Sequence, residues 1–309
     1  MIGVIINPRS GYVAAHGVDH MRRLIEGSLP DARLHVLQPG EQVEAICRDF
    51  LAAGVACIAA AGGDGTVSSV ASMVVGTETA LGVIPAGTLN HFARDIDVGR
   101  DVPEALRVLA HGYVMPVDVA RVNDRIFLNN SSIGLYARMV RIRHRYEQRL
   151  GKWRALLSAA WLVLRKARSI QVQVSDGASA EELHTYLLFV GNNQYELNLA
   201  RLGRRACLNA GQLSVFTLEQ PNRIQLFPQV FHLLREAHPD RRLFRSLSMS
   251  ELTVIPHRRH RGPEAVACDG EVFLIDPPLV YRSVPRALRV VVPEPPPPGS
   301  REVRDNAPG

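Results

Sequence analysis

Nine residues, from Ala59 to Val67, constrain the fold of this chain more than any other stretch: Ala-Ala-Ala-Gly-Gly-Asp-Gly-Thr-Val. The short apolar run 55–58 before them predicts a buried strand. Apolar residues at 67, 70, 71 and 74 follow a helical spacing, and Thr66 stands where an N-cap residue is expected. The stretch therefore predicts a glycine-rich turn, with one carboxylate, between a buried strand and a helix.

Such a turn is typical of phosphate-binding sites, because glycines let backbone amides approach a phosphate and a helix N-terminus favours negative charge. Asp64 would repel phosphate unless a cation or a proton intervened, so we expect it to act through Mg²⁺ or to accept a proton. The alternative is an ordinary turn, where Asp-Gly is common. Two other phosphate loops are excluded, because Gly151-Lys152 is followed by Trp153 and the dinucleotide fingerprint lacks its last glycine.

Two more polar loops follow predicted strands in the first third of the chain. Asn7-Pro8-Arg9-Ser10-Gly11 comes after strand 2–6, and Pro85-Ala86-Gly87-Thr88-Leu89-Asn90 comes after strand 80–84. In an open parallel sheet such loops share the edge at which ligands bind. With a strand at 33–37 and helices at 18–29, 41–53 and 102–111, we expect an α/β nucleotide-binding domain with an open, mainly parallel sheet.

The pattern changes near residue 114. Two apolar runs, 116–122 and 126–132, flank Asn123-Asp124 and predict a β-hairpin. Further strands are expected at 170–174, 183–190, 212–218, 252–255, 266–268, 272–275, 280–283 and 288–292, with a helix at 221–238. We therefore expect an α/β domain at 1–120, a mostly antiparallel β-sandwich domain at 121–293 with a basic helical insert at 135–168, and a disordered Pro-rich tail at 294–309.

The basic charge is concentrated in one segment. The whole chain has 36 basic and 30 acidic residues, but the segment from Arg138 to Arg168 has ten basic residues and one acid. Trp153 and Trp161 lie on an apolar stripe there, so we expect contact with an anionic membrane surface. The alternative is a helix that packs this stripe on the core. Nucleic acid is not expected, because aromatic residues are not interleaved with these cations.

The cysteines and the apolar runs bear on the compartment. Cys47, Cys57, Cys207 and Cys268 lack metal-site spacing, so we expect core thiols in a reducing compartment. No signal-peptide pattern is visible, and no apolar run approaches the ~20 residues that span a bilayer. We expect a cytoplasmic protein that is peripheral at the inner face of the membrane, and a homodimer is one open alternative.

Asp269-Gly270-Glu271 lies between two predicted strands of the second part. By itself it is a hairpin turn. The functional interpretation is a pair of carboxylates on a tight turn, one orienting the other as a general base.

The ordered set of these motifs resembles the diacylglycerol kinase-like lipid kinases, a family that includes bacterial soluble lipid kinases and sphingosine kinases. The matching stretches are 7–11, 62–66, 85–90, 92–94, 129–134, 191–192 and 269–271, and the resemblance covers about residues 1–292. The glycine–aspartate turn alone is shared with NAD kinases.

This resemblance implies an active site between the two domains, with ATP as phosphoryl donor, Mg²⁺ as cofactor and a lipid hydroxyl as acceptor. It implies that Glu271 accepts the proton, with Asp269 beside it, and that Asp64 links to Mg²⁺. The implied nucleotide contacts are Asn7, Pro8, Arg9, Ser10, Gly11, Gln38, Gly62, Gly63, Asp64, Gly65, Thr66, Val67, Ser68, Gly87, Thr88 and Asn90.

Three positions depart from the family pattern. His91 stands where Asp is usual, and Ala210 stands where an Asp often contributes to a structural metal site. Leu197-Asn198-Leu199 replaces a glycine-rich run. Two alternatives stay open: an NAD kinase-like soluble phosphotransferase, and a catalytically inactive lipid-binding regulatory protein of the same fold, which these departures support.

Overall fold

The computed structural model describes residues 1–99, 101–135, 137, 169–175, 180–193, 208–219, 244–257 and 262–293. Several predicted features lie outside these ranges: the segment from Arg138 to Arg168, the run 197–199, the helix 221–238 and the tail 294–309.

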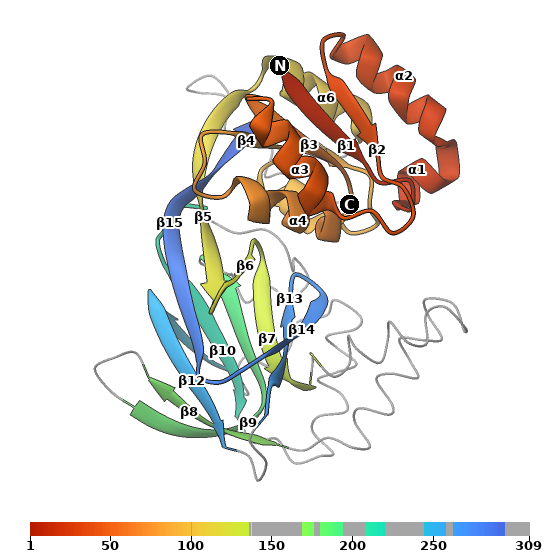
Figure 1. Cartoon of the computed structure of the whole chain (residues 1–309). Helices are drawn as coiled ribbons and strands as arrows, with labels where there is room; N and C mark the ends of the chain where they lie inside the picture. The colour runs from red at the N-terminus through yellow and green to blue at the C-terminus, as the bar shows by residue number, and fades with distance from the viewer. Residues whose placement is uncertain are drawn as a thin grey trace, which may run out of the picture.

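Four parallel strands form the centre of the N-terminal part: β1 (Ile2–Ile6), β2 (Arg33–Val36), β3 (Cys57–Gly62) and β4 (Ala80–Pro85), in the order β4-β3-β1-β2. Helices cover both faces (Figure 1). α3 (Val43–Ala52), α4 (Asp64–Val74) and α5 (His91–Asp95) pack on the face that includes Ile5 and Ile58. α1 (Gly11–His16), α2 (Val18–Ser28) and α6 (Val102–His111) pack on the opposite face, with Val4 and Ala59. Neighbouring strand residues thus enter different cores, as the two-residue repeat of a strand requires.

Two long strands connect this part to the rest of the molecule. β5 (Tyr113–Val122) and β15 (Leu279–Val292) pair with each other in antiparallel fashion (Figure 1). At one end β15 pairs in parallel with β4, and at the other it pairs with β12 (Glu251–His257). The predicted boundary between residues 120 and 121 falls inside β5, and the division into domains there stays a prediction.

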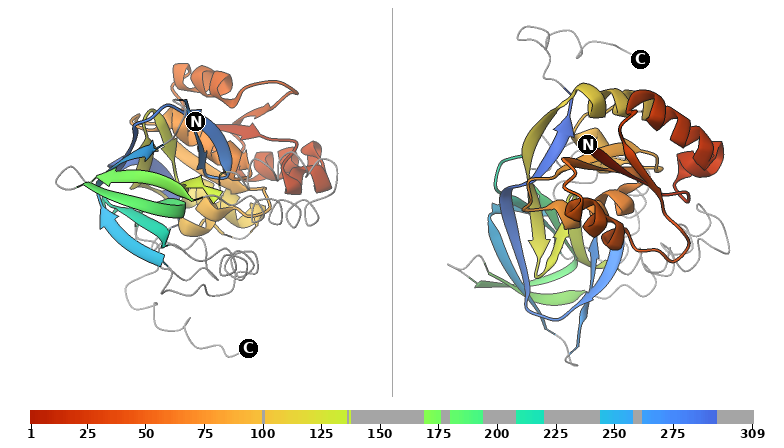
Figure 2. Two further views of the ribbon diagram at one scale, coloured as in Figure 1. Left: turned by 90° about the horizontal axis from the view of Figure 1, so that it is seen from below. Right: turned by 45° about the horizontal axis from the view of Figure 1, so that its top comes forward.

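The remaining strands are antiparallel: β6 (Arg125–Phe127), β7 (Asn130–Gly134), β8 (Ile170–Ser175), β9 (Ala180–Asn192), β10 (Leu213–Glu219), β11 (Phe244–Met249), β13 (Glu264–Cys268) and β14 (Glu271–Ile275). Figure 2 shows them curving around a common interior, which is filled by side chains such as Phe127, Leu188 and Tyr281. The mixed sheet, parallel first and then mostly antiparallel, confirms the predicted fold class.

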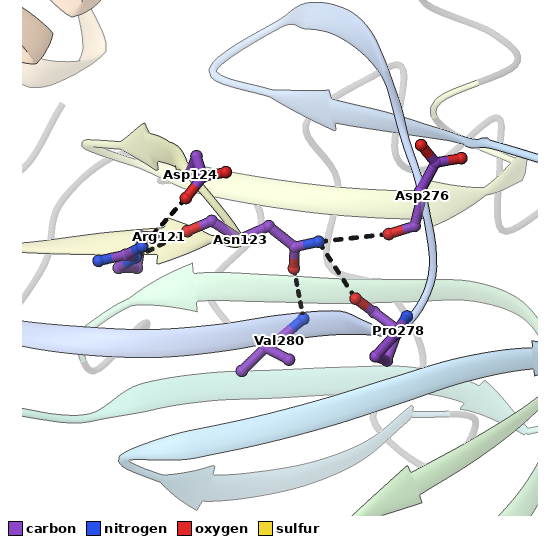
Figure 3. A network of polar contacts seen from close by, with 6 residues as sticks. All are labelled: Arg121, Asn123, Asp124, Asp276, Pro278 and Val280. Atoms are coloured by element: carbon purple, nitrogen blue, oxygen red, sulfur yellow. Dashed lines mark hydrogen bonds and ion pairs between the residues drawn. The ribbon is translucent and has the colours of Figure 1, made fainter.

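The turn between β5 and β6 anchors the loop that follows β14 (Figure 3). Asn123 is left-handed, with φ of 50°, and its side-chain amide donates to the carbonyls of Asp276 and Pro278 at 3.3 and 3.1 Å. Its side-chain oxygen accepts the Val280 amide at 2.8 Å. The predicted Asn-Asp hairpin turn is therefore present, and it also fixes the far end of the strand that begins at Glu271.

The turn between β3 and α4 is shorter than the sequence predicts, because β3 ends at Gly62 and α4 begins at Asp64. β3 continues through Ala59, Ala60 and Ala61, all fully buried, because small side chains fit between the two helical layers. α4 already begins at Asp64 with Gly63 as its N-cap, so the assignment of Thr66 as N-cap is wrong. Thr66 lies in the first turn, where its hydroxyl accepts a hydrogen bond from Asn7.

Three other strand predictions are corrected. The run 126–132 is two strands, because the amides of Leu128, Asn129 and Asn130 donate to the Asp269 carboxylate. The runs 280–283 and 288–292 are one strand, β15, with a register shift between Val284 and Leu288. β11 was not expected at all. Within the described part of the chain, no helix combines the length and hydrophobicity needed to cross a bilayer.

Candidate active site

A cleft opens where the three predicted loops meet. Each loop follows the carboxyl end of a parallel strand, β1, β3 or β4, so all three lie at one edge of the sheet. The cleft has a volume of about 440 Å³, within the range of about 300–1,000 Å³ for small-molecule pockets. Its lining consists of polar side chains, glycines and one valine: Asn7, Arg9, Ser10, Gly11, Val43, Gly63, Gly65, Thr66, Ser69, Gly87, Thr88 and Glu271.

Side chains within the first loop hold its shape. The Asn7 side-chain amide donates to the Thr66 hydroxyl at 2.9 Å, which ties the first loop to the start of α4. The Asn7 side-chain oxygen accepts the Arg9 amide at 3.0 Å, and the Ser10 hydroxyl donates to the Asn7 carbonyl at 2.8 Å. Asn7 thus shapes the loop that presents Arg9 and Ser10 to the cleft.

The second and third loops touch through glycines. A Cβ atom on Gly87 would lie 2.4 Å from the Cα atom of Gly63, a distance that real atoms do not show. Asn90, with φ of 51°, closes the third loop: its side chain accepts the Gly87 amide at 3.0 Å and donates to the Gly87 carbonyl at 3.1 Å. The two loops can approach this closely only because neither carries a side chain at the contact.

The cleft offers favourable contacts to an anion. The amides of Asp64, Gly65 and Thr66 open α4, an 11-residue helix, and so have no acceptor within that helix. Backbone amides at a helix N-terminus attract negative charge. Arg9 is exposed at the cleft, and no ion pair joins it to another described residue. These residues fit the phosphates of a nucleotide.

Asp64 lies beside this anion site and turns its carboxylate toward α5. The Phe92 amide donates to Asp64 Oδ1 at 3.4 Å. The negative charge of Asp64 thus faces the N-terminus of a second helix, which begins at His91. No group of three or more His, Cys, Asp or Glu side chains able to hold a metal ion occurs among the described residues. A nucleotide-bound Mg²⁺ needs only one or two carboxylates besides water and phosphate, so Asp64 fits such an ion.

Glu271 enters the cleft from the opposite side. It is the first residue of β14, and a Cβ atom on Gly65 would lie 3.0 Å from Glu271 Oε1. The Asp269 carboxylate, two residues earlier, accepts hydrogen bonds from Ser68 and from three backbone amides. Burial raises the pKa of Asp269, and these four hydrogen bonds oppose the rise. The structure thus brings together two stretches that are about 200 residues apart in the sequence.

Several predicted nucleotide contacts do not line the cleft, and their roles stay predictions: Pro8, Gln38, Gly62, Asp64, Val67, Ser68 and Asn90. Val67 is 3% exposed and belongs to the core beneath α4. The Gln38 amides donate to Glu41 and to the Val36 carbonyl. Sequence reasoning missed Val43 and Ser69. Ser69 could not be separated from Ser68, because one residue turns the helix by about 100° and the first helical residue was not known.

Ala210 stands at the position where the family often has the Asp of a structural metal site. Ala210 has no carboxylate, and its amide donates to the Asn193 side chain at 3.0 Å. The neighbouring Gly211 amide donates to Asp118 at 2.7 Å. The loss of that metal site stays a prediction.

Comparison with known families supports the resemblance found in the sequence. Residues 1–122 match the family model described as the diacylglycerol kinase catalytic domain. A Klebsiella pneumoniae (strain 342) protein named probable lipid kinase YegS-like is 26% identical over 273 residues, which cover 84% of this chain and 86% of the relative. A Staphylococcus aureus (strain JH9) protein named diacylglycerol kinase is 23% identical over 240 residues, 72% of each chain.

The fold is also found among solved structures. A crystal structure of a diacylglycerol kinase from Bacillus anthracis str. Sterne superposes with a TM-score of 0.71 and 21% identity. The superposition covers 95% of this chain and 97% of that chain. At this identity the likeness establishes the fold alone.

Proposed function

We propose that this chain is a lipid kinase, which transfers the γ-phosphoryl group of ATP to a lipid hydroxyl, because residues 1–122 match the diacylglycerol kinase catalytic domain. The observation that carries this proposal is the cleft itself. A helix N-terminus, two glycine loops and Arg9 line one side, and a single carboxylate, Glu271, enters from the other. This arrangement supports a phosphotransferase with a general base.

The residues in and beside the cleft divide into two roles. The α4 amides, Arg9, Ser10 and Thr88 bind and orient the phosphates, which brings the reacting groups together. Asp64 is the residue that would hold Mg²⁺. When bound, that ion neutralises the negative charge of the phosphate oxygens.

Glu271 accepts the proton from the lipid hydroxyl as that oxygen forms its bond to the γ-phosphorus. The bond between the γ-phosphorus and its bridging oxygen breaks, and ADP leaves with the electron pair. The products are a phosphorylated lipid, ADP and a proton on Glu271, which is then released to water. General-base catalysis of this kind contributes about 10²–10⁴ in rate.

The membrane contact is a separate part of the proposal. The segment from Arg138 to Arg168, which lies outside the described residues, has ten basic residues and one acid. Attraction to anionic lipid follows from this charge. It should weaken with salt, because the Debye length falls from about 10 Å at 0.1 M to about 3 Å at 1 M.

The test is incubation with radiolabelled ATP, Mg²⁺ and vesicles of total lipid extract, with NAD as a competing soluble acceptor. We expect a labelled lipid, formed faster at 0.1 M than at 1 M salt. Label in NAD would favour the NAD kinase-like alternative. Lipid binding without any ATP consumption would favour the regulatory protein.

The Glu271→Gln variant tests the proposed base in the same assay. We expect turnover to fall about 10²- to 10⁴-fold while ATP binding persists. The glutamine side chain has nearly the shape of glutamate, but its amide cannot accept the proton. Glu251→Gln is the control, because Glu251 lies on β12 and, among the described residues, its carboxylate pairs with Arg282 at the surface. Unchanged turnover in Glu271→Gln would contradict the assignment.

A further inference from the structure

The Asp269 carboxylate joins three distant segments. Its Oδ2 atom accepts the Ser68 hydroxyl at 2.7 Å and the Leu128 amide at 2.8 Å. Its Oδ1 atom accepts the amides of Asn129 and Asn130 at 2.8 and 3.1 Å. Ser68 lies on α4, the amides lie between β6 and β7 and at the first residue of β7, and Asp269 lies on the turn between β13 and β14. The carboxylate therefore connects the nucleotide side of the molecule to the antiparallel side.

We propose that Ser68 and Asp269 are positioning residues, which fix the turn 269–270 on α4 and so hold the Glu271 carboxylate at the cleft. This inference rests on the proposed kinase function and goes beyond it. It gives Asp269 a role through Glu271 rather than on the substrate, and it takes Ser68 out of the nucleotide contacts.

The hydrogen bonds account for the whole accepting capacity of Asp269. An ionised carboxylate has two oxygens with about four lone-pair sites. Here each oxygen already accepts two donors. The Asp269 amide also donates to the Asn130 carbonyl at 2.9 Å. A group bound in this way is suited to holding its segment in place, and it has no oxygen left for a substrate proton.

Because the turn 269–270 is short, fixing Asp269 also restricts the position of Glu271. Cys268 and Glu271 are paired across the hairpin, so the turn consists of Asp269 and Gly270 alone. Both are left-handed, with φ of 47° and 86°, which is the geometry of a tight two-residue hairpin. A turn this short has little freedom, so the position of Asp269 largely sets that of Glu271.

α4 receives both residues on one face. Ser68 follows Gly65 by three positions, and residues three apart are neighbours on a helix. Ser68 contacts Asp269, and Gly65 is the residue whose absent side chain leaves room for Glu271. Ser69, one position further, lines the cleft instead. Two successive turns of α4 therefore receive Asp269 and Glu271.

The experiment compares Ser68→Ala with Ser72→Ala in the lipid phosphorylation assay. Ser72 is on the same helix, but its hydroxyl donates to the Ser69 carbonyl of that helix rather than to Asp269. We expect Ser68→Ala to lower kcat about 10- to 100-fold with an unchanged KM for ATP, because a displaced base slows chemistry and the nucleotide cleft is intact. Ser72→Ala should match the unaltered protein, and Ser68→Thr, which keeps a hydroxyl, should restore most of kcat.

A double-mutant cycle adds a second criterion. Asp269→Asn should also lower kcat, and the Ser68→Ala/Asp269→Asn double variant should lose little more than Asp269→Asn alone, since both changes disrupt the hydrogen bond between Ser68 and Asp269. Full kcat in Ser68→Ala would overturn the proposal, because the contact with α4 would then not be needed to position Glu271.

Hydrogen exchange keeps the inference testable apart from the activity. The amides of Leu128, Asn129 and Asn130 should exchange faster in Ser68→Ala than in Ser72→Ala. Their common acceptor, the Asp269 carboxylate, loses its hydrogen bond to α4 in the first variant and keeps it in the second. Absence of phosphoryl transfer in the unaltered protein would refute the proposed function, and unchanged exchange would refute the positioning role.

Discussion

At the scale of single residues, the cleft depends on positions where a side chain is missing. Gly63 and Gly87 come from different loops, and their backbones meet where a Cβ atom would overlap the neighbouring chain. Gly65 leaves the space that Glu271 occupies. Their spacing in the sequence indicated a phosphate site, but the contacts between loops depend on the fold.

Substitution of Gly87 by alanine tests this close approach. The new Cβ atom would lie 2.4 Å from Gly63 and 2.8 Å from the Asn90 side-chain oxygen, so one loop must move. We expect a loss of about 1–3 kcal/mol in the free energy of unfolding and weaker ATP binding, measured by urea titration and calorimetry. Gly27→Ala is the control: no atom lies within 4 Å of its new Cβ, and alanine within α2 should stabilise by about 0.5–1 kcal/mol. Equal stability of both variants would contradict this account.

At the scale of elements, the two long strands β5 and β15 carry the chain from one part to the other. Asp118 of β5 is 1% exposed, and its carboxylate accepts the Gly211 amide at 2.7 Å and the Arg286 amide at 2.8 Å. Arg286 is left-handed, with φ of 53°, and lies at the register shift of β15. Asp118 therefore stabilises the register shift within β15, the strand that pairs with β12 at one end and with β4 at the other.

The Asp118→Ala variant removes an acceptor from both amides. A hydrogen bond to a charged group contributes about 1.5–3 kcal/mol, and both of these are partly buried, so we expect the free energy of unfolding to fall by about that amount in urea. Asp124→Ala is the control, since Asp124 is fully exposed and its 3.5 Å pair with Arg121 contributes less than about 1 kcal/mol. If the free energy of unfolding falls no further in Asp118→Ala than in the control, Asp118 does not stabilise the register shift of β15.

At the scale of the whole molecule, the parts are joined by continuous strands rather than by a linker. β15 pairs with β12 at residues 279–282 and with β4 at residue 290, while β5 pairs along its length. Three unpaired, buried thiols report on the two sides: Cys47 and Cys57 on the nucleotide side, and Cys268 beside the 269–270 turn. Burial raises the pKa of each of them to about 12.

These thiols provide a test of cooperative unfolding. Because the thiolate is the reactive form, all three should react very slowly with a thiol reagent at pH 8 in the folded protein. The raised pKa is lost on unfolding, so reactivity should appear at the same urea concentration for all three, as read by mass spectrometry. Cys207, which lies outside the described residues, is replaced by serine for this purpose. Earlier exposure of Cys47 and Cys57 than of Cys268 would show that the two sides unfold separately.

Local patterns determined much of this protein from the sequence. The apolar strands, the helices at 18–29 and 102–111, the change to antiparallel pairing near residue 114 and the three polar loops all depend on neighbours in the chain. The ends of elements were less predictable. β3 extends through three alanines because both of its faces are covered, and the strand after Phe127 breaks because its amides donate to Asp269.

Only the tertiary structure decided which chemistry meets at the cleft. The sequence suggested a base at Glu271 and a phosphate turn at Asp64, yet no local pattern brings stretches so far apart together. The path of β5 and β15 does so, together with the Asp269 carboxylate, which takes its donors from two distant segments, α4 and residues 128–130. Backbone amides make most of those contacts, and because every residue except proline carries an amide, such contacts leave no trace in the amino-acid sequence.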